Sequence, residues 1–184
     1  MSLVIQCVKA TLCLAVCSLT VSVGVLAQAP ASETPTALTT LDQKFVRNAA
    51  ADGVLEVELG RLAQQRGGGG EVKRFGERMV QDHSRLNADL QRIAAARGVS
   101  LPAKLGRERE AVLGQIGRLS GAEFDSAYSK QVVADHQRAV ASFDQQALTA
   151  NDPELKAWAA QALPTLREHL QTARSLSPNV TLGQ

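Results

Sequence analysis

The sequence has few aromatic residues, little net charge and no cysteine beyond its N-terminal end. Aromatic side chains make up 3% of the 184 residues, which disfavours the base-stacking surfaces of single-strand nucleic-acid binders and a β-rich core. The formal net charge of +2 is too small for a nucleic-acid-binding protein. Hydrophobic residues (45%) and charged residues (21%) fit one globular domain better than a disordered chain.

The three cysteines all precede residue 18. They are Cys7, Cys13 and Cys17. They lie in or next to the apolar run 11–27, which follows a basic residue and ends in small residues, the pattern of a secretory signal peptide cut after Ala27. An uncleaved membrane anchor is the alternative, because the run is near the shortest length that spans a bilayer. We predict a protein exported to the periplasm, outer membrane or cell envelope, whose mature chain has no disulfide or thiol nucleophile.

The rest of the chain divides by composition into a linker, a folded domain and a tail. Residues 28–40 are rich in proline, alanine and threonine, which predicts a flexible linker. Apolar residues then recur every three or four positions, which predicts helices throughout residues 41–176. The predicted long helices cover about residues 41–66, 71–97, 120 to beyond 143, and 153–176. Residues 177–184 are predicted to form a short tail.

Helix-capping residues and turns support these boundaries. Thr40 is a candidate cap for the first helix, Ser120 and Glu123 form a capping-box pattern, and Asp152 precedes a proline at the first helical position. The four glycines at 67–70 follow no strand and precede no Gly-Lys-Ser/Thr sequence, so they indicate a turn between helices and not a phosphate-binding loop.

The unequal connections between the helices predict the fold class. Short turns join helices one and two, and helices three and four, whereas residues 98–119 separate the second helix from the third and contain a short helix at about 108–119. Two helical hairpins joined by one long crossover form a ferritin-like four-helix bundle. A simple up-down-up-down bundle is the alternative.

The three histidines of the chain occupy the apolar stripes of three different helices. They are His83, His136 and His169. One inward histidine is usually a hydrogen-bonded core residue, but chance inward placement of all three is only about 6% if a stripe covers two-fifths of a helix. Counting about 1.5 Å per residue from the turns places all three, and Glu56 of the first helix, near the middle of the bundle.

These side chains have the donor atoms of a transition-metal site. Imidazoles with a carboxylate suit zinc, copper or iron, so we predict Glu56, His83, His136 and His169 as ligands. Possible secondary residues are Asp52 and Glu58 on the first helix and the acids that precede each histidine, Asp82, Asp135 and Glu168. These three acids either orient a ring nitrogen across helices or form ion pairs with arginine or lysine.

A working di-iron centre is disfavoured because the Glu-x-x-His motif is absent. Val80, Val133 and Leu166 stand where that motif needs glutamate. We find no activated nucleophile, so a turnover enzyme is not expected.

Several spaced motifs resemble one known family. They are Phe45 with 56–60 (EVELG), 79–83 (MVQDH), 120–125 (SGAEFD), 135–136 (DH) and 163–170 (LPTLREHL). The sequence is similar to bacterial exported proteins of the domain of unknown function (DUF) 4142 family, related to the ferritin-like superfamily, over about residues 41–176. The resemblance implies a helical bundle in the cell envelope and implies no established activity.

Two functional hypotheses follow. The first is a metal-binding envelope protein that uses the three histidines and Glu56. The second is a structural or interaction bundle without metal, for envelope stress or surface association, whose histidines only satisfy polar groups in the core. The sequence predicts no nucleic-acid partner and indicates no particular protein partner or oligomeric state.

Overall fold

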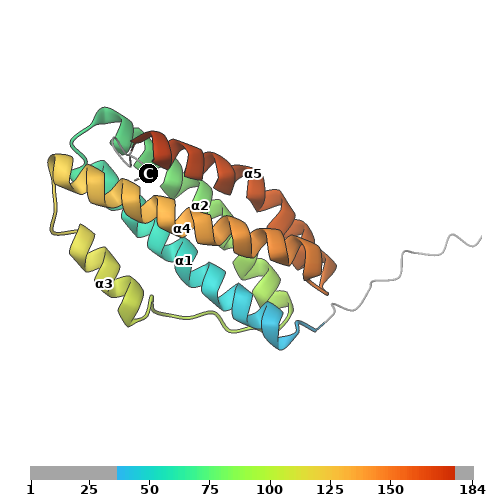
Figure 1. The fold of residues 1–184 in the computed structure, drawn as a ribbon. Coiled ribbons are helices and arrows are strands. Elements are labelled where there is room, and N and C mark those ends of the chain that lie inside the picture. The colour runs from blue at the N-terminus through green and yellow to red at the C-terminus, as the bar shows by residue number, and fades with distance from the viewer. Residues whose placement is uncertain (1–36, 177–184) are drawn as a thin grey trace, which may run out of the picture. The chain divides into compact units, whose positions relative to one another are not determined.

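The computed structural model describes residues 37–176, which form five helices and no strand (Figure 1). The helices are α1 (Thr40–Arg66), α2 (Gly70–Ala96), α3 (Arg107–Ile116), α4 (Gly121–Thr149) and α5 (Pro153–Leu176). The predicted all-helical class is therefore confirmed. The predicted signal peptide, most of the linker and the tail lie outside the described residues. None of the described helices is long and apolar enough to cross a membrane.

The four long helices pack as two hairpins side by side (Figure 1). α1 packs against α2 and α4 against α5, while α1 also contacts α4 and α2 contacts α5. A backbone bridge between Gly67 and Gly121 places the start of α4 beside the end of α1. α4 therefore runs antiparallel to α1, and the connection that carries α3 joins the end of α2 to the start of α4.

The helix starts agree in part with the predicted caps. Thr39, and not Thr40, caps α1, because its side chain accepts the N–H of Asp42 while the Asp42 carboxylate accepts the N–H of Thr39. Asp152 caps α5 as predicted by accepting the Leu155 N–H at 2.8 Å. The predicted Ser120 capping box is wrong.

Ser120 precedes α4 but makes no capping bond with its side chain. Gly121 has φ +59°, a left-handed conformation that breaks the geometry of a capping box. The Asp125 carboxylate instead accepts the N–H groups of Gly68 and Gly69, at 3.0 Å each. This contact ties the start of α4 to the α1–α2 turn.

The hydrophobic core consists of two clusters that meet near the middle of the helices. One cluster includes Phe45, Leu90 and Trp158, and the other includes Leu59, Met79 and Tyr128. Along α2, α4 and α5, each histidine lies between the residues of the first cluster and those of the second. The polar residues therefore occupy the boundary between two well-packed apolar regions.

Two glycines allow α1 and α2 to approach closely. A Cβ at Gly76 would lie 2.6 Å from the Gly60 carbonyl oxygen and 2.6 Å from the Ala63 Cβ. We predict that Gly76→Ala lowers the free energy of unfolding by about 1–3 kcal/mol, because the helices must separate to admit the methyl group. Urea denaturation checks this, with Gly114→Ala as a control, since a Cβ at Gly114 meets nothing within 4 Å. Equal stability of the two variants would contradict the predicted clash.

Candidate metal centre

The structure brings the three predicted histidines together in the interior. Each offers a ring nitrogen within 4.8 Å of those of the other two. The ring centroids lie 5.4, 5.3 and 5.3 Å apart, which is a nearly equilateral triangle. The side chains come from α2, α4 and α5 and are at most 6% exposed. The depth expected from residue counting is thus confirmed for the histidines.

Neighbouring groups fix the orientation of two of the rings. The Nδ1 of His136 lies 3.1 Å from the Val132 carbonyl oxygen, which can only accept, so Nδ1 carries the proton. The Nε2 of His169 lies 3.0 Å from an Asp82 carboxylate oxygen and donates to it. In the neutral rings, His136 Nε2 and His169 Nδ1 therefore keep their lone pairs. These are the atoms that a metal ion would use.

The two ring nitrogens that keep their lone pairs have few hydrogen-bond partners in the protein. His136 Nε2 lies 3.3 Å from His83 Nε2. His169 Nδ1 is buried and has no hydrogen-bond partner within residues 37–176. A buried nitrogen without a partner is costly, and a bound cation would satisfy it. The donor set therefore fits a metal ion better than it fits a closed hydrogen-bond network.

Burial keeps the three imidazoles neutral. It lowers the pKa of His83 well below its usual value, and His136 and His169 lower it further. Burial and His169 lower the pKa of His136 to about 3. Burial also lowers the pKa of His169, although the hydrogen bond to Asp82 opposes this effect. Neutral imidazole is the form that binds metal, so these rings are ready to coordinate at neutral pH.

Glu56 is buried beside the histidines and lies outside their group of converging nitrogens. Its Oε1 is 3.8 Å from His136 Nδ1, the ring nitrogen that faces Val132, and its Oε2 has no hydrogen-bond partner within residues 37–176. Burial raises its pKa well above the usual value, and Asp135 and Asp52 raise it further. Burial thus favours the protonated form of Glu56, which borders the cluster from α1.

The predicted secondary acids occupy different positions. Asp82 reaches across from α2 to His169 and also pairs with Arg78 and Arg85. Asp135 is partly buried near Glu56, where burial raises its pKa, and it bonds to Gln131 and Arg138. Of the three acids before the histidines, Asp82 is the one that orients a ring.

Three of the predicted secondary acids form ion pairs outside the histidine cluster. Glu58 pairs with Arg61, and Glu168 pairs with Arg78 at the surface. Asp52, a possible secondary residue on the sequence, lies outside the core. Its side chain is 59% exposed and pairs with Arg109 of α3 at 2.7 Å. A separation of four residues rotates Asp52 by about 40° from Glu56, which is enough to take it out of the core.

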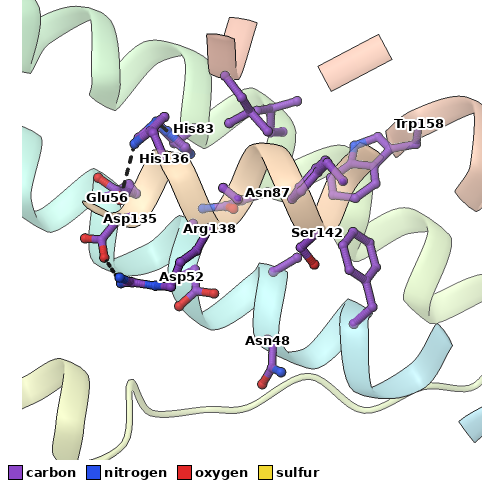
Figure 2. A pocket seen from close by; sticks show the side chains of 17 residues that line it. Asn48, Asp52, Glu56, His83, Asn87, Asp135, His136, Arg138, Ser142 and Trp158 are labelled. Atoms are coloured by element: carbon purple, nitrogen blue, oxygen red, sulfur yellow. Dashed lines mark hydrogen bonds and ion pairs between the residues drawn. The ribbon is translucent and has the colours of Figure 1, made fainter. Parts of the chain in front are cut away.

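A pocket of about 240 Å³ adjoins the cluster. Glu56, His83 and His136 contribute to its lining, and Trp158 lies farther along it (Figure 2). His169 is not among the lining residues. Neither the pocket nor the role of the Val132 carbonyl was predicted, because the pocket depends on how the helices pack and the Val132 contact depends on the orientation of the His136 ring. The i to i+4 spacing of Val132 and His136 is the one sequence signal for the contact between the Val132 carbonyl and the His136 ring.

Fold and site together define a helical-bundle protein with a buried cluster of three histidines. The chain belongs to the DUF4142 family, whose description is "Domain of unknown function (DUF4142)" and whose model matches residues 27–176. The resemblance noted in the sequence is thus confirmed. A comparison with curated proteins finds no match.

One solved structure shares the fold. It is the crystal structure of a DUF305 fragment from Deinococcus radiodurans, with a TM-score of 0.69 and 17% sequence identity. The match covers 77% of this chain and 98% of that fragment. At this identity the similarity supports the helical architecture and carries no argument about the site.

Proposed function

We propose that the protein binds one transition-metal ion, zinc or copper, through His83, His136 and His169. The observation that carries the proposal is the convergence of three buried, neutral imidazoles, two of them oriented by hydrogen bonds to Val132 and Asp82 so that the other ring nitrogen keeps its lone pair. Three nitrogen donors suit zinc and copper. Iron is less favoured, because non-haem iron sites commonly include a carboxylate ligand and Glu56 is not among the converging donors.

We also propose that the protein acts in the cell envelope and that its helices have a ferritin-like topology. The apolar run before Ala27 supports export. The two hairpins and the long connection support the ferritin-like order of helices. After cleavage the chain would have no cysteine, so the imidazole of histidine would be its main ligand for zinc or copper.

Metal analysis of the full chain tests the proposed function. Untagged protein purified without chelators is expected to contain close to one equivalent of zinc or copper by mass spectrometry. Metal-free protein should regain one equivalent in a calorimetric titration with Zn²⁺, or with Cu⁺ under reducing conditions. Far less than one equivalent in both measurements would leave the structural bundle without metal as the function.

Asp82 offers a test of the surroundings of the site. We predict that Asp82→Asn lowers metal affinity about 10- to 100-fold, because the carboxylate that orients His169 and increases its basicity is lost. A competition titration against a chelator measures this loss. Glu168→Gln is the matched control, since Glu168 also pairs with Arg78 but lies at the surface. Equal affinities of the two variants would show that the Asp82 contact has no role in binding.

A further inference from the structure

The pocket beside the histidines has an acidic end. Asp52, Glu56 and Asp135 line it together with one cationic side chain, that of Arg138, while Arg109 of α3 pairs with Asp52 from outside the lining. Arg138 already pairs with Asp135, and its side chain is 70% exposed. Figure 2 shows Glu56 and Asp135 close together at one end of the pocket and Trp158 at the other. Burial favours the protonated form of Glu56, but the other two acids of the lining outnumber its one cationic side chain. The lining therefore favours a positively charged group over an anion.

One oxygen of the buried carboxyl group at the acidic end lacks a hydrogen-bond partner. Glu56 is 4% exposed, and its Oε2 has no hydrogen-bond partner within residues 37–176. A buried carboxyl oxygen left unsatisfied is costly. A donor brought in by a ligand would remove that cost, which is an indication independent of the acidic lining.

The other end of the pocket is aromatic. Phe45 and Phe143 have ring centroids 5.1 Å apart, and Trp158 lies 6.2 Å from the first and 5.1 Å from the second. Aromatic faces contact apolar bodies well and also attract cations. The pocket volume of about 240 Å³ is below the roughly 300–1,000 Å³ typical of sites for drug-sized ligands. A small occupant fits this space.

We propose that this pocket binds a small organic amine with an aromatic or apolar body. The ammonium group lies at the end formed by Asp52, Glu56 and Asp135, and the body lies against Phe45, Phe143 and Trp158. This site adjoins the histidines but does not need a metal ion, so it can be tested on protein treated with EDTA. Its failure would leave the proposed metal site unaffected.

Trp158 supplies the readout because it is the only tryptophan in the chain and lines the pocket. The full metal-free chain is titrated with 2-phenylethylamine, with neutral 2-phenylethanol and with anionic phenylacetate. We expect a saturable change in Trp158 fluorescence with the amine at the lowest concentration and with phenylacetate at the highest. No saturable change with the amine, or tighter binding of phenylacetate, would overturn the proposal.

Two pairs of variants locate the site. Ala139→Leu fills the pocket and should weaken amine binding by about tenfold or more, whereas Ala141→Leu, at an exposed position of the same helix, should not. Asp52→Asn should weaken binding by about fivefold. Its control is Glu58→Gln, which removes an α1 acid that does not line the pocket. Because Asp52 is exposed, its variant remains informative if Ala139→Leu does not fold. Equal amine affinities of the Asp52→Asn and Glu58→Gln variants would overturn the assignment of the ammonium group to this end of the pocket.

Discussion

His83→Leu is expected to remove metal binding while the metal-free protein stays folded. The substitution removes one of the three converging donors of the metal site. Metal affinity should therefore fall by more than the 10- to 100-fold that is lost when a residue that only orients a ligand is removed. The only hydrogen-bond partner of the His83 ring within residues 37–176 is His136 Nε2. Leucine has a similar size, but His136 Nε2 loses its hydrogen-bond partner, which costs about 1–3 kcal/mol of the free energy of unfolding.

Competition with a chelator measures the loss of affinity, and urea denaturation in EDTA measures stability. Ser84→Leu is the matched control, because it adds the same side chain at the exposed neighbouring position and should bind metal as the parent protein does. Unchanged affinity in His83→Leu would remove His83 from the ligand set. A large loss of stability in EDTA would instead show that the His83–His136 contact is structural, as the hypothesis without metal requires.

The sequence predicts the histidine cluster well because it depends on helix periodicity and on distance from the turns. His83, His136 and His169 each share a stripe with core residues, and residue counts from two tight turns place them at one depth. In a regular helix the rotation and the rise per residue are constant over many residues. Small errors at the helix ends therefore do not change which face a residue lies on or how deep it lies in the bundle. Thr39 replaces Thr40 as the cap of α1, for example, without moving the site.

Features that depend on the packing angle between helices are much harder to predict. A helical wheel cannot separate Asp52 from Glu56, because a rotation of about 40° decides between solvent and core. The pocket depends on the space left between α1 and α4, and the Asp82–His169 bond crosses from one hairpin to the other. Pairing of Asp82 with arginine or with histidine was left open by the sequence, and the structure shows both.

The second prediction with a large effect concerns the pH dependence of stability in the metal-free protein. The folded state lowers the pKa of all three histidines, that of His136 from about 6.5 to about 3. Below about pH 6.5 the unfolded chain therefore binds protons that the folded chain does not. Each such histidine makes the free energy of unfolding fall by about 1.4 kcal/mol per pH unit as the pH decreases. For His136 this loss extends from about pH 6.5 to about pH 3.

Glu56 acts in the opposite direction. Its raised pKa means that the folded state holds a proton above pH 4.5, where the unfolded chain has released it, so this residue lowers stability as the pH rises. Asp135 has the same sign because its pKa is also raised.

Urea denaturation in EDTA at a series of pH values separates these contributions. The parent protein should lose stability steadily below pH 6.5, and His83→Leu should lose it less steeply, by about 1.4 kcal/mol per pH unit. Glu56→Gln should be more stable than the parent near neutral pH, because glutamine does not have to stay protonated in the core. If His83→Leu instead followed the parent curve, the His83 pKa would not be lowered in the folded state. Its ring would then be charged or open to water, and the buried neutral donor set that supports metal binding would be incomplete.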